Sequence, residues 1–136
     1  EIPFGKADIK REGKDVTIIA IQKMVEFSLK AAKKLEEEGI DVEVVDPRTL
    51  SPLDLDTLIK SAEKTRRVII VDESYPRCGI AADIAAQIGE KMFGKLKAPI
   101  RRVIPPHAHI PYVGHLEDEW VPNVDKIVSA VKDILR

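Results

Sequence analysis

The sequence has 136 residues, 44% of them hydrophobic and 33% charged, which is the composition of one globular domain rather than of a disordered chain. Its 22 Lys and Arg residues against 23 Asp and Glu residues leave a net charge of −1, which argues against a basic nucleic-acid-binding domain. A single Cys excludes an internal disulfide framework and fits a reducing compartment, and no apolar run approaches the roughly 18 residues of a membrane span.

The chain begins Glu1-Ile2-Pro3-Phe4-Gly5, without an initiator Met or a signal peptide, as a linker does where it enters a domain. We therefore expect residues 1–136 to be a single domain and a fragment of a longer subunit. A short strand is expected at residues 7–10. The turn residues at 12–14 that follow it suggest a hairpin with the next strand.

A nearly continuous apolar run at residues 16–21 predicts that next strand, and such runs are typical of parallel strands covered on both faces. Apolar residues at intervals of three and four then predict a helix at 24–35. A β-branched run at 42–45 predicts a further strand. Ser51 is expected to cap a second helix that starts at Pro52 and carries its apolar residues at 55–62, because the Ser51 side chain can accept a hydrogen bond from the first turn.

A second continuous apolar run predicts a strand at residues 68–71, followed by a helix at 80–92 and a strand at 100–104. Asn123 is expected to cap a closing helix at 124–135. Strands and helices that alternate in this way predict right-handed βαβ units. The fold class expected from the residues is therefore α/β, as a three-layer α/β/α sandwich.

The loop at residues 105–122 is the one long irregular stretch, and loops of this length in a compact domain are usually functional. It contains four prolines and more apolar and aromatic side chains than a solvated loop needs. We interpret it as an interface with Tyr112, Trp120, His107 and His109 as candidate contacts. The alternative is that the two aromatic rings pack into the core of this same domain.

Three histidines, His107, His109 and His115, could in principle bind a zinc ion. Alternate residues of an extended segment point to opposite sides, however, and the neighbouring prolines stiffen the loop against wrapping a metal. An interface loop is therefore favoured over a metal site.

The end of the third predicted buried strand carries the other candidates for chemistry. Asp72 and Glu73 could form an acid/base pair or a Mg²⁺ site, or Glu73 could hold the following loop through backbone amides or Arg77. Cys78 stands where a helix begins, which favours a reactive thiolate, or it is a small side chain packed beneath the loop. In both cases the structural interpretation is favoured, because no phosphate-binding loop accompanies the carboxylates and the sequence cannot show the base that a catalytic cysteine needs.

Several strings of the sequence, taken in order, resemble the C-terminal domain of the β subunit of thiamine-diphosphate-dependent 2-oxo acid dehydrogenases. The most specific is VDPRTLSPLD at residues 45–54, and the others are GIAADI at 79–84, APIRRV at 98–103 and PY at 111–112. The resemblance covers essentially the whole chain. It is strongest to the β subunits of acetoin dehydrogenase and pyruvate dehydrogenase.

The resemblance implies a transketolase C-terminal-like domain, with a five-stranded mixed sheet of order 1-3-2-4-5 whose first strand is antiparallel to the rest. That order replaces the hairpin suggested by the turn at residues 12–14. It also implies an intact cytoplasmic enzyme with thiamine diphosphate and Mg²⁺, built from two α and two β subunits. This enzyme would work with a dihydrolipoyl acyltransferase in a multienzyme complex.

The chain departs from the family pattern in two ways. It contains neither the G-D-G nor the N-N motif that binds the diphosphate and Mg²⁺, so no catalytic, cofactor-binding or metal-binding residue carries over. At Gln22 the family usually shows Gly or a small residue, which puts the local turn geometry in question.

Three functions follow as hypotheses. The first is a non-catalytic assembly domain that contributes subunit contacts and docks the acyltransferase. The second is a standalone small enzyme that uses Asp72, Glu73, Cys78 and the histidine loop. The third is a flavodoxin-like binding module. Neither a nucleic acid nor a membrane is expected as a partner.

Overall fold

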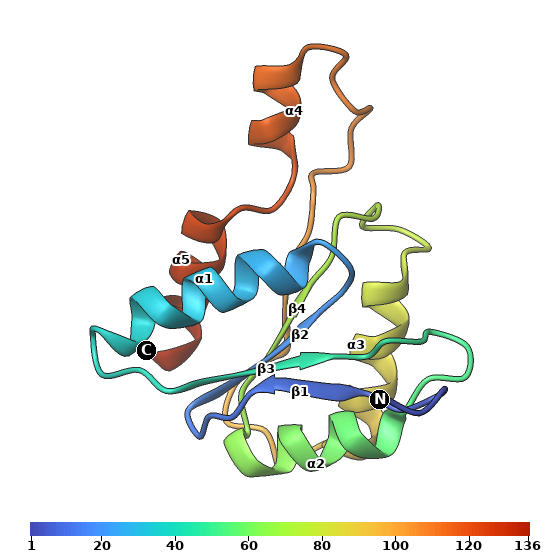
Figure 1. The fold of residues 1–136 in the computed structure, drawn as a ribbon, viewed down its shortest axis with the longest axis vertical. Coiled ribbons are helices and arrows are strands. Elements are labelled where there is room, and N and C mark those ends of the chain that lie inside the picture. Colours follow the sequence, from blue (N-terminus) through green and yellow to red (C-terminus); the bar gives the residue numbers. More distant parts are fainter.

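The computed structural model describes residues 1–136, in which strands and helices alternate around one sheet (Figure 1). The strands are β1 (Asp8–Arg11), β2 (Val16–Ala20), β3 (Val42–Asp46), β4 (Val68–Val71) and β5 (Arg101–Val103). The helices are α1 (Met24–Glu36), α2 (Leu55–Thr65), α3 (Ile80–Lys91), α4 (Gly114–Trp120) and α5 (Val124–Leu135). No helix combines the length and the apolar character needed to cross a bilayer.

The sheet has the order β1-β3-β2-β4-β5, and all neighbouring strands are parallel except β1, which runs antiparallel to β3. This confirms the mixed sheet that the resemblance implies. A hairpin of β1 with β2 is wrong, because β3 and β4 occupy both edges of β2. β1 pairs instead with the outer edge of β3, where Ile9 stands opposite Val45.

Helices α1 and α5 cover one face of the sheet, and α2 and α3 cover the other (Figure 1). Successive residues of β2 point to opposite faces, so Ile18 joins the cluster under α1 and α5 while Ile19 joins the cluster under α2 and α3. All residues of β2, β3 and β4 are buried, as expected for parallel strands covered on both faces.

Helix α2 begins later than the sequence pattern suggests. Ser51 does not cap it, because the cis Ser51–Pro52 peptide bond lies in a preceding turn. Asp54 is the cap, and its carboxylate accepts hydrogen bonds from the Thr57 amide at 3.4 Å and the Ala7 amide at 3.1 Å. Burial alone would raise the pKa of Asp54, but these hydrogen bonds, that of the Thr57 hydroxyl and the nearby Lys6 ammonium keep it below its usual value.

The stretch from residue 105 to 122 is not wholly irregular, since α4 lies within it. This helix has no side-chain cap at its start, at Val113. It stands away from the sandwich at the end of a long connection from β5 (Figure 1). We call residues 105–121 the arm.

Candidate functional site: the arm and the carboxyl edge of the sheet

The arm is exposed along nearly its whole length. Every residue from 106 to 119 is exposed except the half-buried Pro111. Tyr112 is fully exposed, and Ile110, Val113 and Leu116 each expose about half of their surface. A soluble domain rarely exposes so many neighbouring apolar side chains unless another surface covers them.

The base of the arm is fixed to the sandwich. Trp120 is only 7% exposed and packs edge-to-face on Tyr75, with 5.9 Å between the ring centroids. The ammonium of Lys126 donates hydrogen bonds to the backbone carbonyl of Glu119, in the last turn of α4, and to that of Val121, just after the helix. Of the two aromatic candidates, Trp120 therefore packs within this domain and Tyr112 faces outward.

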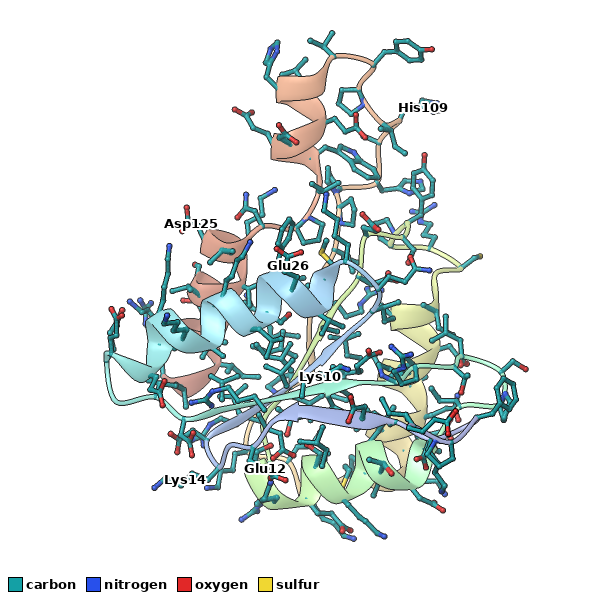
Figure 2. The ribbon with its side chains drawn as sticks, viewed as in Figure 1. Lys10, Glu12, Lys14, Glu26, His109 and Asp125 are labelled. Carbon is teal, nitrogen blue, oxygen red and sulfur yellow. The ribbon has the colours of Figure 1, made fainter.

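The histidines lie on the same arm. His107, His109 and His115 are all exposed, and Figure 2 shows His109 on the connection that leads to α4. Nowhere in the chain do three or more His, Cys, Asp or Glu side chains come together in a way that could hold a metal ion.

At the end of β4, Asp72 and Glu73 have different surroundings. Asp72 is buried and accepts a hydrogen bond from the Ser74 hydroxyl. Glu73 makes neither a hydrogen bond nor an ion pair with Arg77, so the carboxylate that holds the following loop is Asp72 and not Glu73. The two side chains do not form a shared acid/base site.

Cys78 is exposed rather than packed beneath the loop. Its backbone is left-handed, with φ of 56°, and it precedes Gly79, which starts α3. A Cβ on Gly79 would lie 2.2 Å from the Tyr75 carbonyl oxygen, so only glycine fits there. No hydrogen bond joins the Cys78 thiol to a base, and a catalytic cysteine needs such a base.

The turns after β2 and β3 hold functional candidates that the sequence did not single out. Gln22 and Arg48 both have left-handed backbone conformations, with φ of 53° and 62°. Non-glycine residues rarely adopt this region, and they gather at functional sites. Two features of the sequence point to these turns: Gln22 stands where the resembled family usually has a small residue or Gly, and Arg48 lies in the most specific string of the resemblance.

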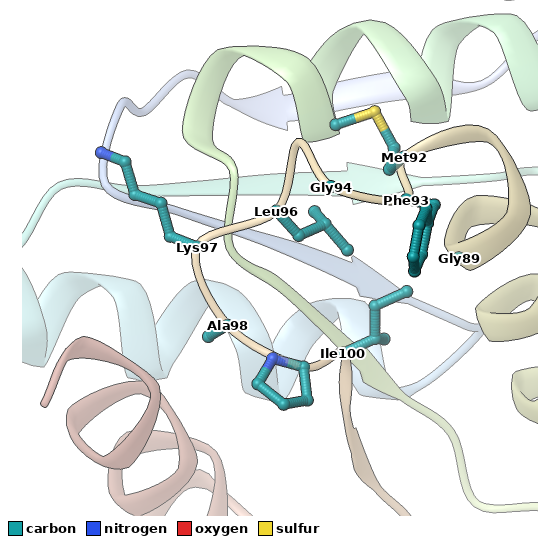
Figure 3. Close-up of a pocket in the computed structure, with 9 residues that line it drawn as sticks. Gly89, Met92, Phe93, Gly94, Leu96, Lys97, Ala98 and Ile100 are labelled. Carbon is teal, nitrogen blue, oxygen red and sulfur yellow. The ribbon is translucent and has the colours of Figure 1, made fainter.

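A separate apolar hollow lies at the end of α3, where the chain turns toward β5 (Figure 3). It has a volume of about 480 Å³, and Phe93 beside it is 90% exposed. No set of polar groups converges on it, so it offers binding surface but no chemistry.

The chain is similar to characterised proteins along nearly all of its length. It is 54% identical over 134 residues to the β subunit of acetoin:2,6-dichlorophenolindophenol oxidoreductase of Bacillus subtilis (strain 168), covering 98% of this chain and 39% of that protein. It is 46% identical over 134 residues to the β subunit of the pyruvate dehydrogenase E1 component of the same organism, covering 98% of this chain and 41% of that protein. The chain thus spans about two fifths of the length of these relatives.

A solved structure described as a split gene transketolase, an inactive beta4 tetramer, has the same fold. It superposes with a TM-score of 0.85 at 29% identity, over 98% of this chain and 43% of that one. The family described as "Transketolase, C-terminal domain" matches residues 5–127. The arrangement of strands, the two covered faces and these similarities agree, and the chain belongs to the transketolase C-terminal domain family.

Proposed function

We propose that this chain is the C-terminal assembly domain of the β subunit of a thiamine-diphosphate-dependent 2-oxo acid dehydrogenase that acts on pyruvate or acetoin. In this proposal residues 1–136 form one domain of a longer cytoplasmic subunit. Its partners are an α subunit, a second β subunit and a dihydrolipoyl acyltransferase. The similarity to acetoin and pyruvate dehydrogenase β subunits over 98% of the chain supports the choice of enzyme class.

The exposed arm is the observation that carries the assembly role. Its apolar side chains stand outside the sandwich, on a base that Trp120 and Lys126 hold in place. A fixed base and three prolines in the arm reduce the entropy lost on binding, which suits a preorganised contact surface. Tyr112, which is fully exposed, is the strongest candidate for an anchor at this surface.

The residues of this chain do not fit thiamine diphosphate with Mg²⁺. The turn after β2 is Ile21-Gln22-Lys23, which lacks the glycines of a phosphate-binding loop. No group of acidic side chains converges to hold a cation. We therefore derive no catalytic step from this domain, and we expect calorimetry of the chain with thiamine diphosphate and Mg²⁺ to give no saturable binding.

The assembly role is tested by reconstituting the complete β subunit with its α subunit. Changing Tyr112 to Ala should weaken assembly by about 2 kcal/mol or more, or about thirtyfold in Kd, if the ring is an interface anchor. Phe93→Ala is the matched control, because Phe93 is an exposed aromatic outside the arm. Sedimentation analysis of the parent and both variants measures the effect, and assembly of the Tyr112→Ala variant with the affinity of the parent subunit would refute the assembly role of the arm.

The standalone enzyme remains the alternative of a different class. It would need Asp72, Glu73 or Cys78 to act with a base, and these side chains do not form a catalytic pair in the structure. Hydrolase or transferase activity of the chain alone, lost on Cys78→Ser, would support this alternative instead.

A further inference from the structure

At the carboxyl ends of the neighbouring strands β2 and β3, the connections leave toward opposite faces of the sheet. From β2 the chain leaves to α1 on one face of the sheet, and from the neighbouring β3 it leaves to α2 on the other face (Figure 1). Where neighbouring parallel strands send their connections to opposite faces, a crevice opens, and open α/β sheets bind their ligands in such crevices. The arm lies outside this position.

A hollow of about 440 Å³ occupies this crevice. Its volume is within the range of small-molecule sites, which is roughly 300–1,000 Å³. The residues that line it are Ile21, Gln22, Asp46, Pro47, Arg48 and Leu50. All of them belong to the two turns that follow β2 and β3.

The backbone of both turns is held in an uncommon conformation at this hollow. Gln22 and Arg48 each stand two residues after the end of a strand, and each is left-handed. A non-glycine residue pays roughly 1–2 kcal/mol for this conformation, so the surrounding hydrogen bonds must fix it. They do so at Arg48, whose amide donates to Asp46 Oδ1 at 2.9 Å.

The charges at the hollow favour a small anion. The Arg48 guanidinium is half-exposed, and its only polar contact is a long one of 3.5 Å to Asp46 Oδ2. Most of its five N–H donors are therefore free for a ligand, in the fork geometry that matches a carboxylate. Asp46 is nearly buried and holds Arg48 at the mouth of the hollow.

The same charges disfavour a phosphate. No second cation lines the hollow, and a phosphate dianion would be repelled by the Asp46 carboxylate. A monocarboxylate pairs with Arg48 at a lower electrostatic cost. The apolar side chains of Ile21, Pro47 and Leu50 can contact a short aliphatic body.

We propose that the crevice between the ends of β2 and β3 is a binding site for a short-chain aliphatic monocarboxylate, with Arg48 as the residue that pairs with its carboxylate. This site is separate from the arm, and it does not depend on the proposed function. Gln22 contributes an amide at the rim of the hollow.

The experiment uses the 136-residue chain, which has a closed hydrophobic cluster on each face of its sheet. Sodium butanoate is titrated into the ¹⁵N-labelled chain, and amide shifts are followed by NMR. We expect saturable shifts confined to residues 21–24 and 46–50, with a Kd in the low-millimolar range. Arg48→Met keeps the aliphatic bulk but removes the cation, and it should raise this Kd by about ten- to hundredfold.

Arg66→Met is the matched control, because Arg66 is also an exposed arginine with a left-handed backbone, with φ of 59°. It should bind butanoate as the parent chain does. Butanamide, which has the same shape without the charge, should give no saturable shifts. The proposal is overturned if butanoate produces no saturable shifts at these residues, if Arg66→Met weakens binding as much as Arg48→Met, or if inorganic phosphate binds more tightly than butanoate.

Discussion

Glu43 is a carboxylate with no solvent exposure, in the middle of the buried strand β3. It accepts hydrogen bonds from the Gly13 amide at 3.2 Å and the Ser61 hydroxyl at 2.5 Å, and it pairs with the Lys64 ammonium. Lys64 also contacts Glu12 at 2.8 Å. A buried carboxylate without such partners would lower the free energy of unfolding by several kcal/mol. These contacts also join β3 to α2 and to the turn before β2.

The removal of Lys64 tests this network. Lys64→Met leaves Glu43 without its cation, and it should lower the free energy of unfolding by about 1–3 kcal/mol. The loss is not larger, because the Lys64 side chain is partly exposed, so water can approach the place of its ammonium. Lys60→Met on the same helix is the control, because Lys60 is exposed and unpaired, and it should change stability by less than about 0.5 kcal/mol. Urea unfolding at neutral pH measures both variants, and equal losses would contradict the role of the pair.

The same pair makes a pH-dependent contribution. Hydrogen bonds to Glu12 and Glu43 raise the pKa of Lys64 above its ordinary value of 10.5. A raised pKa in the folded state gives stability that is complete below the unfolded-state pKa and is lost as pH rises through the folded-state pKa. The difference in stability between the parent chain and Lys64→Met should therefore be constant near pH 8 and narrow above pH 10.5, as measured by urea unfolding in alkaline buffers.

Among the elements, the turn between β1 and β2 shows how one residue fixes a connection. A Cβ on Gly13 would lie 2.3 Å from the backbone of Val42 and of Glu43, so the turn passes directly against β3. Gly89 in α3 has nothing within 4 Å of its Cβ position. A side chain therefore has no space at Gly13, whereas it has open space at Gly89.

Alanine at these two glycines should have opposite effects. Gly13→Ala must push β1 or β3 aside, and we expect a loss of at least about 2 kcal/mol. Gly89→Ala should raise stability by about 0.5–1 kcal/mol, because alanine favours a helix interior. Thermal and urea unfolding of both variants provide the measurement, and tolerance of alanine at Gly13 would mean that the turn can move away from β3.

The elements that the sequence predicted well are those with strong periodic patterns. The strand at 68–71 and the helix at 124–135 have the predicted bounds, because a buried apolar run and a capped amphipathic face are local signals. Helix α4 has no such signal. It starts at Gly114 without a cap, and residues outside the helix hold it in place: Tyr75 packs on its Trp120, and Lys126 bonds its Glu119 carbonyl.

The candidate site could be predicted from the sequence only in part, because the exposure and position of its residues depend on contacts between distant segments. Tyr112 and Trp120 lie in one loop and are both aromatic, and nothing in the sequence separates the exposed ring from the buried one. The Asp46–Arg48 turn belongs to the most specific string of the resemblance. Its left-handed backbone and its position beside Gln22 depend on how two distant strands are paired.

The attachment of α4 to the sandwich can be tested through Trp120. Trp120→Ala removes the contact with Tyr75, and we expect amide hydrogen exchange in residues 114–120 to accelerate at least tenfold while the amides of β2 and β4 keep their protection. Tyr112→Ala is the control on the same arm and should leave exchange unchanged, because the Tyr112 side chain is fully exposed. Unchanged exchange in Trp120→Ala would show that Lys126 alone holds the arm.

At the scale of the whole molecule, the two hydrophobic clusters lie on opposite faces of one sheet and share its central strands. Ile84 of α3 belongs to one cluster and Ile127 of α5 to the other, and both are fully buried. β2 contributes side chains to both clusters. If the helices on either face leave the sheet, they therefore expose buried side chains of this shared strand to water. The two faces should therefore unfold as one unit.

Truncations on the two faces test this coupling. Ile84→Ala and Ile127→Ala should each lower the free energy of unfolding by about 2–5 kcal/mol through the cavity they leave. Because the two side chains belong to separate clusters on opposite faces of the sheet, their effects should add to within about 0.5 kcal/mol in the double variant. Both single variants should keep one urea transition with the m value of the parent chain, seen alike by far-ultraviolet circular dichroism and by Trp120 fluorescence. Two separate transitions, or a clearly smaller m value in one variant, would mean that α5 or α3 can leave its face while the rest of the sandwich stays folded.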